Sequence, residues 1–212
     1  MENISEKNGR QTFVAGNQKR NLSTNVLVKV ALLSAISFVL MFIEMPIPIF
    51  PSFLKIDISD IPALVAGLAL GPIAGFMVEF IKNLLHLITS TQTGGVGELA
   101  NVIVGGSFVV TSSMIYRKNR DAKSYIKAFL AATIVMTLVG SIVNYFFLLP
   151  FYGQLMGMDA IIGMGKAVNP KVNDLLSFVL WFIAPFNLLK GLILSILSVP
   201  FFKKLDNILK SK

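Results

Sequence analysis

The sequence predicts an all-α integral membrane protein: a bundle of six transmembrane helices with both termini cytoplasmic. Only 14% of the 212 residues are charged and 54% are hydrophobic, whereas soluble domains carry about 25% charged residues. Several apolar runs reach the roughly 20 residues that a helix needs to cross the hydrocarbon core of a bilayer. Basic residues gather at three places along the chain, and such clusters report the orientation of membrane helices. Together these observations exclude a soluble globule.

Six apolar segments follow one another along the chain. They lie at about 25–45, 60–70, 72–91, 98–116, 125–151 and 175–202. The first is too long for the apolar core of a signal peptide, and no small-residue cleavage site follows it, so we expect a retained helix. We therefore expect one transmembrane domain over 25–205, with a polar N-terminal tail over 1–24 and a short basic C-terminal tail over 206–212.

A break at Gly71-Pro72 separates the second apolar segment from the third. Gly-Pro pairs mark turns rather than helix interiors. Ser59 or Asp60 followed by Pro62 is typical of a helix start. We expect a tight helical hairpin here rather than one long helix.

The basic clusters support this division. They lie in the N-terminal tail (Lys7, Arg10, Lys19, Arg20), in the 117–127 connection (Arg117, Lys118, Arg120, Lys123, Lys127) and at the C-terminus (Lys203, Lys204, Lys210, Lys212). With six spans all three face one side, which the positive-inside rule assigns to the cytoplasm. With five spans they would face opposite sides. Topology therefore explains the net charge of +8, and no nucleic-acid partner is needed.

Three connections are expected on the outer side. The proline-rich, apolar segment 46–60 is expected to fold back over the bundle, and 91–98 to form a glycine-rich turn. The segment 152–174 is expected to be the longest loop, one that could act as a lid. A ligand from outside would enter past these connections.

Polar residues inside the apolar segments are the main functional signal, because polar groups at membrane depth are costly and usually face the bundle interior or a cavity. They share a helical face in four segments: Glu79, Lys82, Asn83 and His86; Glu98, Asn101 and Gly105; Thr137, Ser141 and Asn144; Asn187 and Lys190. For any single Ser, Thr or Asn, an interhelical hydrogen bond is the competing interpretation.

Lys190 is the most unusual of these residues, because no acid lies in its own segment. It is expected either to contact a ligand or to pair with Glu98 or Glu79. Glu79 also has Lys82 one turn away as a possible partner. His86 has no apparent companions for a metal site, so we expect a satisfied interior histidine.

The sequence also argues against an enzyme and against a resident cofactor or metal. It has no cysteine, which excludes thiol catalysis and cysteine-ligated metals, and it has only a single histidine. It contains neither a GxSxG nor a GxxxxGK[ST] motif, so it lacks a phosphate-binding loop with which to use ATP itself. Ala31 and Ala35, and likewise Gly67, Gly71 and Gly75, form small-xxx-small patterns that allow close helix packing.

Four sequence blocks point to a known family. They are "FLKIDISDIPALVAGLALGPIAGFMVEFIKNLLH", "GVGELANVIVGG", "NYFFLLPFY" and "APFNLLKG". The chain resembles, over about 25–205, the riboflavin-specific S-component of energy-coupling factor (ECF) vitamin transporters. The resemblance implies a multi-pass cell-membrane protein that captures riboflavin from outside. It also implies partners, namely a transmembrane coupling subunit and two cytoplasmic ATPase subunits. Ala31 and Ala35 match the AxxxA motif with which the family contacts the coupling subunit.

The resemblance further implies site residues. Asn144, Asn187 and Lys190 match the asparagines and lysine of the family's flavin pocket. An asparagine amide can satisfy a donor and an acceptor of the flavin edge together, whereas lysine offers only donors.

The other candidate residues are assigned by ligand chemistry. Phe53 and Leu54 would cover the ring, and Lys55, Asp57, Glu98 and Asn101 would meet the ribityl chain. Two alternatives are left open: the same architecture with another cargo (thiamine, biotin or pantothenate), and a membrane enzyme or solitary ion-coupled carrier with Glu79, Lys82 and His86 as a proton relay.

Overall fold

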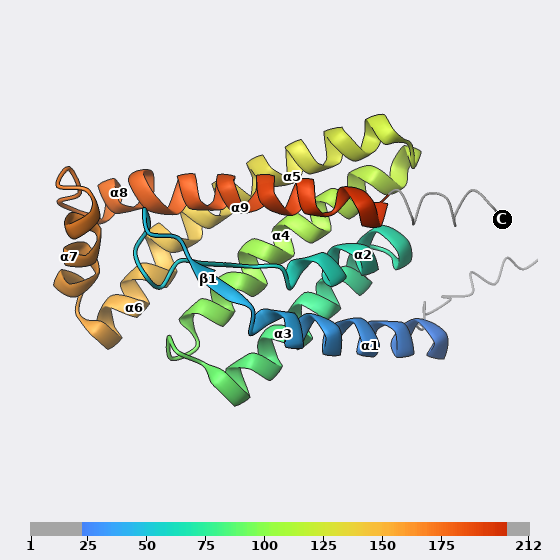
Figure 1. The fold of residues 1–212 in the computed structure, drawn as a ribbon, viewed down its shortest axis with the longest axis horizontal. Coiled ribbons are helices and arrows are strands. Elements are labelled where there is room, and N and C mark those ends of the chain that lie inside the picture. The colour runs from blue at the N-terminus through green and yellow to red at the C-terminus, as the bar shows by residue number, and fades with distance from the viewer. Residues whose placement is uncertain (1–22, 203–212) are drawn as a thin grey trace, which may run out of the picture.

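The computed structural model describes residues 23–202, which form a helical bundle (Figure 1). The elements are α1 (Thr24–Met41), β1 (Glu44–Pro46), β2 (Lys55–Asp57), α2 (Asp60–Leu70), α3 (Pro72–Ser90), α4 (Val96–Asn119), α5 (Ala122–Val143), η1 (Asn144–Leu148), α6 (Leu149–Met156), α7 (Met158–Val168), α8 (Leu175–Phe178), η2 (Val179–Ile183) and α9 (Ala184–Leu197). The predicted tails lie outside the described residues, apart from the last two residues of 1–24.

Five helical stretches within residues 23–202 are long and apolar enough to cross a membrane: Thr24–Met41, Pro72–Ser90, Val96–Asn119, Lys123–Met156 and Leu175–Leu197. The predicted membrane class is therefore confirmed. The second apolar segment is α2, which has 11 residues and so rises only about 16 Å. Most of its side chains are buried, because α2 packs against α1, α3 and α4 and touches α9.

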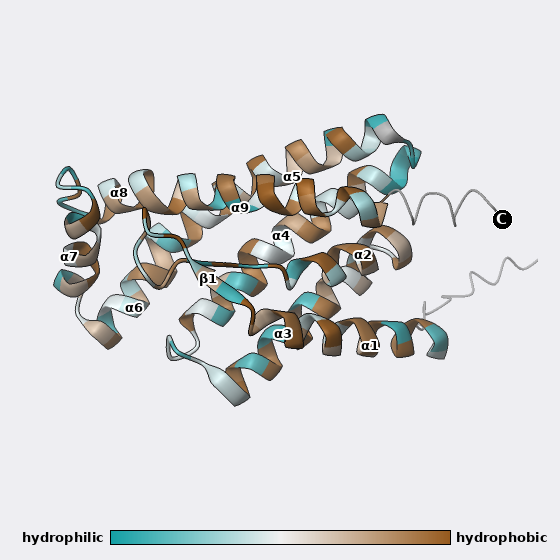
Figure 2. Ribbon diagram, in the orientation of Figure 1, coloured by the Kyte–Doolittle hydropathy of each residue, from teal (hydrophilic) through white to brown (hydrophobic). Residues whose placement is uncertain are grey.

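Hydrophobic side chains cover the outside of the bundle. Figure 2 shows them along α1, α5 and α9, while hydrophilic residues gather at the α4–α5 turn. On α1, Leu32 and Val39 are each 62% exposed, as suits contact with lipid tails. The small residues Ala31 and Ala35 are exposed on the same helix, whereas Ser37 is buried.

The break at Gly71 is confirmed. Gly71 has a φ of 124°, a conformation that favours glycine, and it turns the chain from α2 into α3. Within this hairpin a Cβ on Gly75 would lie 2.7 Å from the Gly67 Cα. The second small-residue pattern is thus internal packing between α2 and α3.

The connection between α1 and α2 folds back over the bundle, as predicted. It contains an antiparallel hairpin of β1 and β2, a small departure from an all-α fold. Phe50, from the loop of this hairpin, packs edge-on against Phe186 at 5.4 Å and Phe182 at 6.4 Å between ring centroids. The turn before α4 is glycine-rich, with Gly94 and Gly95 at positive φ.

The expectation of a long loop over 152–174 is wrong. Most of this segment is helical, in the end of α6 and in α7, and Gly157 at a φ of 86° separates the two helices. Ile161 of α7 is fully buried and joins an apolar cluster with Phe178, so tertiary packing holds the segment in place. Asp174 then caps α8 by accepting a hydrogen bond from the Ser177 backbone N–H at 2.7 Å. That bond keeps the pKa of Asp174 below its ordinary value.

Short π-helical segments lie where α5 meets α6 and where α8 meets α9. They are η1 and η2, and each is followed closely by a proline, Pro150 and Pro185. Proline lacks the backbone N–H that an α-helix requires and so favours such widened turns. Asn144 is the first residue of η1, and Asn187 lies in the first turn of α9, just after η2.

Candidate ligand-binding cavity

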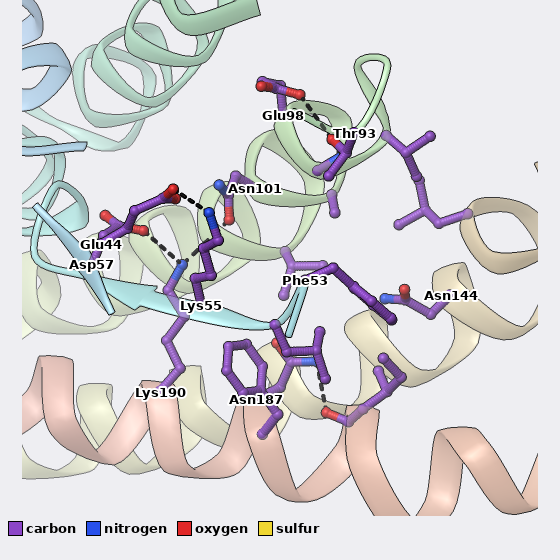
Figure 3. A pocket seen from close by; sticks show the side chains of 18 of the residues that line it. Glu44, Phe53, Lys55, Asp57, Thr93, Glu98, Asn101, Asn144, Asn187 and Lys190 are labelled. Atoms are coloured by element: carbon purple, nitrogen blue, oxygen red, sulfur yellow. Dashed lines mark hydrogen bonds and ion pairs between the residues drawn. The ribbon is translucent and has the colours of Figure 1, made fainter. Parts of the chain in front are cut away.

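A cavity of about 540 Å³ lies between the β1–β2 hairpin and the helices α4, η1, α6 and α9 (Figure 3). This volume falls within the range of about 300–1,000 Å³ that is usual for small-molecule sites. The cavity wall includes all nine residues that the sequence singled out: Phe53, Leu54, Lys55, Asp57, Glu98, Asn101, Asn144, Asn187 and Lys190. The fold thus gathers these nine residues from four separate stretches of the chain.

One part of the cavity is apolar. Leu148, Leu149 and Phe186 line it together with Phe53. The Phe53 ring lies edge-on to Tyr152 at 5.5 Å and nearly parallel to Phe178 at 6.1 Å between centroids. This wall suits the faces of a flat aromatic ligand.

The two asparagines are held in place by their own helices. Asn144 Nδ2 donates to the Gly140 carbonyl at 2.8 Å, and Asn187 Nδ2 donates to the Ile183 carbonyl at 2.9 Å. An amide has two N–H donors and a carbonyl acceptor, so each side chain keeps a donor and an acceptor for a ligand. A Cβ on Gly140 would lie 2.5 Å from Asn187 Nδ2, so this glycine makes the space that Asn187 occupies.

Lys190 does not pair with either acid that the sequence suggested. Its Nζ lies 3.1 Å from Asp60 Oδ2 and 3.8 Å from Asp57 Oδ2, and it donates to Asn101 Oδ1 at 3.3 Å. The suggested pairing with Glu98 or Glu79 was wrong because the hairpin and the start of α2 bring two nearer carboxylates to α9. Lys190 is 3% exposed and still lines the cavity.

A second lysine completes a buried network behind the cavity wall. Lys82 is fully buried, lies 2.9 Å from Glu79 and also pairs with Asp60. It donates to Ser59 Oγ at 2.8 Å. The suggested Glu79–Lys82 pair is therefore present, and Asp60 connects both lysines. Because Ser37 of α1 donates to the Ser59 carbonyl, the network also reaches the first helix.

Glu98 lines a second polar part of the cavity wall, where neighbouring side chains hold it in place. His86 Nδ1 lies 2.7 Å from Glu98 Oε1, so His86 is a satisfied interior histidine, as predicted. Thr91 and Thr93 donate to Glu98 Oε2 at 3.1 and 3.3 Å. The α3–α4 turn is thereby attached to the cavity wall.

The β1–β2 hairpin also contacts the α3–α4 turn through side chains. Lys55 pairs with Glu44 across the two strands and donates to Gln92 Oε1 at 2.7 Å. Lys55 is therefore already engaged by neighbouring side chains at the cavity wall.

Interhelical hydrogen bonding is the wrong interpretation for two residues of α5. Thr137 and Ser141 each donate to the carbonyl four residues earlier in their own helix, at 2.8 Å. Of the polar face predicted for the fifth apolar segment, only Asn144, the first residue of η1, lines the cavity.

Sequence reasoning missed several residues of this region. Asp60 was interpreted only as a helix start, because an acid at that position is ordinarily explained by the helix dipole. Tyr152 and Phe186 line the cavity, but they look like any other apolar residues of a membrane helix.

The described residues define a membrane protein whose helices and β1–β2 hairpin enclose a cavity of a size and lining that suit a small amphipathic molecule. Within residues 23–202 no group of three or more His, Cys, Asp or Glu side chains is placed to hold a metal ion. The polar groups are hydrogen-bond donors and acceptors on an otherwise apolar wall. Such a site binds and orients a ligand.

Comparisons with known proteins give the family. Residues 25–202 match the family described as ECF transporter, substrate-specific component. The chain is 41% identical over 196 residues to the riboflavin transporter RibU of Staphylococcus aureus, covering 92% of this chain and 98% of that protein. It is 38% identical over 183 residues to the riboflavin transporter FmnP of Bacillus subtilis, covering 84% and 90%.

A solved structure agrees. The S component of a bacterial ECF transporter matches with a TM-score of 0.70 and 40% identity, covering 88% of this chain and 98% of that one. The chain therefore belongs to the family of substrate-specific components of ECF transporters. It is a transporter component and not an enzyme, and the family implies a transported substrate rather than a resident cofactor.

Proposed function

We propose that this protein captures riboflavin from the extracellular side and is the substrate-binding subunit of an ATP-driven ECF uptake transporter. The observation that carries the proposal is the cavity in which Asn144, Asn187 and Lys190 meet an aromatic wall. Relatives that are 41% and 38% identical are riboflavin transporters by name, which supports this cargo over thiamine, biotin or pantothenate.

The chemistry of the cavity matches the two parts of riboflavin. The ring faces would lie against Phe53 and Leu54, with the asparagine amides meeting the N–H and carbonyl groups of the ring edge. Lys190 would donate to a ring acceptor. The hydroxyls of the ribityl chain would find Glu98 and Asn101 as partners, together with Lys55 and Asp57 of strand β2.

The proposed topology has six membrane crossings and cytoplasmic termini. In Figure 1 the start of α1, the α2–α3 turn, the α4–α5 turn and the end of α9 lie toward one end of the bundle. The basic connection at 117–127 is at that end, which supports a cytoplasmic assignment. The short helix α2 would make its crossing inside the bundle, shielded from lipid by its neighbours.

The proposed partners are the coupling subunit and two ATPases. No GxxxxGK[ST] motif occurs in the chain, so energy would come from those ATPases. Ala31 and Ala35 are exposed on α1, and small exposed residues permit close approach by another helix. This face is the proposed contact with the coupling subunit.

The proposal is tested by an absorbance spectrum of detergent-purified protein, followed by titration of riboflavin fluorescence. A yellow protein, or saturable quenching at one ligand per chain, is the expected result. Titration with thiamine, biotin and pantothenate under the same conditions provides the comparison. A protein that ignores riboflavin and binds one of those vitamins would contradict the proposed cargo.

A further inference from the structure

The buried carboxylate of Asp60 is the feature that the proposed function leaves unexplained. Asp60 is the first residue of α2 and is 1% exposed. It is absent from the cavity wall, so it would not touch a ligand. Its two oxygens nevertheless hold different lysines: Oδ1 pairs with Lys82, and Oδ2 lies 3.1 Å from Lys190.

The two lysines differ in what else surrounds them. Lys82 does not line the cavity, and it has a second acid, Glu79, at 2.9 Å and the Ser59 hydroxyl at 2.8 Å. Lys190 does line the cavity, and its other acid, Asp57, lies 3.8 Å away. Asp60 is therefore the principal counter-ion of Lys190 and only one of two for Lys82.

The donors of Lys190 can be counted. An ammonium group has three N–H donors. Asn101 Oδ1 accepts a hydrogen bond from one of them at 3.3 Å, and Asp60 Oδ2 takes up a second direction as an ion-pair contact at 3.1 Å. Asp57 Oδ2 at 3.8 Å is beyond hydrogen-bonding distance. One donor is thus left for a ligand acceptor in the cavity.

We infer that Asp60 is a positioning residue for the ligand site, which anchors the charged Lys190 ammonium at the cavity wall with one donor directed to the ligand. This inference rests on the proposed riboflavin site. Lys82 restrains the opposite carboxylate oxygen, so Asp60 is fixed from both sides. Without Asp60, the ammonium would be drawn toward Asp57 and away from its position beside Asn101.

Asp60→Asn tests the inference, because it keeps the size of the side chain and removes its charge. We expect riboflavin to bind at least about tenfold more weakly, a loss of about 1.4 kcal/mol. Asp60→Glu keeps the charge on a longer side chain and should recover part of the affinity. Glu79→Gln is the matched control: Glu79 is as buried as Asp60 and also pairs with Lys82, but its removal should change affinity less than threefold.

A double-substitution cycle separates positioning from a general structural effect. If Asp60 acts through Lys190, the pair Asp60→Asn with Lys190→Met should bind riboflavin as Lys190→Met alone does, within about twofold. This pair also removes both charges together, so it can still overturn the inference even if Asp60→Asn alone does not fold. Folding of each variant is checked by thermal unfolding and size-exclusion chromatography.

The outcomes are distinct. Equal affinity of Asp60→Asn and the unsubstituted protein would overturn the inference and leave the proposed function standing. So would a further tenfold loss when Asp60→Asn is added to Lys190→Met. An unsubstituted protein that does not bind riboflavin would overturn the proposed function and this inference with it.

Discussion

Lys190 shows how a charged side chain is accommodated inside an apolar helix. A lysine at membrane depth costs several kcal/mol unless it is paired or solvated. Here its Nζ has a carboxylate at 3.1 Å and an amide oxygen at 3.3 Å, and it still reaches the cavity. A buried ion pair adds little to folding stability, because the cost of desolvating both charges offsets their attraction. The proposed role in ligand binding therefore explains Lys190 better than a role in stability does.

Lys190→Met should weaken riboflavin binding and leave expression intact. Hydrogen bonds from a charged group contribute about 1.5–3 kcal/mol, so we expect a loss of roughly 10- to 100-fold in affinity, measured by fluorescence titration. Lys82 remains to pair with Asp60, which keeps the network from losing all positive charge. Lys171→Met is the control, because Lys171 lies over the Trp181 ring and away from the cavity wall. Unchanged affinity in Lys190→Met would remove Lys190 from the site.

Gly140→Ala should affect the same site through a neighbouring side chain. The added Cβ would lie 2.5 Å from Asn187 Nδ2, so the amide must move away from its bond to the Ile183 carbonyl. We expect riboflavin to bind about tenfold more weakly, the equivalent of one lost hydrogen bond, with little change in thermal stability. Gly163→Ala on α7 is the control, since nothing lies within 4 Å of its added Cβ. Equal affinities for the two variants would show that Asn187 is not a ligand contact.

At the level of the elements, apolar runs and Gly-Pro signals were sufficient to place the long helices and the short helix α2. The break at Gly71 and the start of α2 at Asp60 lie where the sequence predicted them. The strands β1 and β2 have three residues each and depend on contacts with the helices, so no local pattern shows them. Helix α7 was missed because it packs at the end of the bundle and has no long apolar run.

The candidate site likewise contains residues that the sequence predicted and ion-pair partners that it did not. Asn144, Asn187 and Lys190 stand out as polar residues in apolar helices, and the family resemblance selected them as pocket residues; the structure brings them to one cavity. The partners of Lys190 could not be derived, because Asp57 and Asp60 are distant in the chain and the sequence offers other acids. That choice depends on how the hairpin folds back, which is a property of tertiary packing.

Gly75→Ala should destabilise the α2–α3 hairpin. Its added Cβ would meet backbone, at 2.7 Å from the Gly67 Cα and 2.9 Å from the Ala63 carbonyl oxygen, and backbone cannot move aside as a side-chain end can. Overpacking of this kind typically costs about 1–3 kcal/mol. We expect a lower midpoint of thermal unfolding in detergent, in contrast to the control Gly163→Ala. An unchanged midpoint would mean that α2 can move away from α3 without cost.

At the level of the whole molecule, the proposed ligand site and the proposed partner contact lie on different surfaces. The cavity opens among the hairpin, α4 and α9, whereas Ala31 and Ala35 are exposed on α1. The two surfaces are connected through the β2–α2 junction, because Ser37 of α1 donates to the carbonyl of Ser59, which lies between Asp57 of the cavity wall and Asp60 behind it. Ala31 and Ala35 are nevertheless exposed and absent from the cavity wall, so a substitution there should impair partner binding without impairing ligand binding.

Ala31→Leu is the substitution that makes this separation. Leucine adds a branched side chain where close helix approach requires a small one, so co-purification with the coupling subunit should fall several-fold. Riboflavin affinity of the isolated protein should change less than twofold, because Ala31 is exposed and absent from the cavity wall. Ala160→Leu provides a matched control, since Ala160 is exposed on α7, away from α1 (Figure 1). If the complex forms equally well with both variants, the partner contact lies elsewhere; if Ala31→Leu also abolishes riboflavin binding, α1 supports the cavity itself.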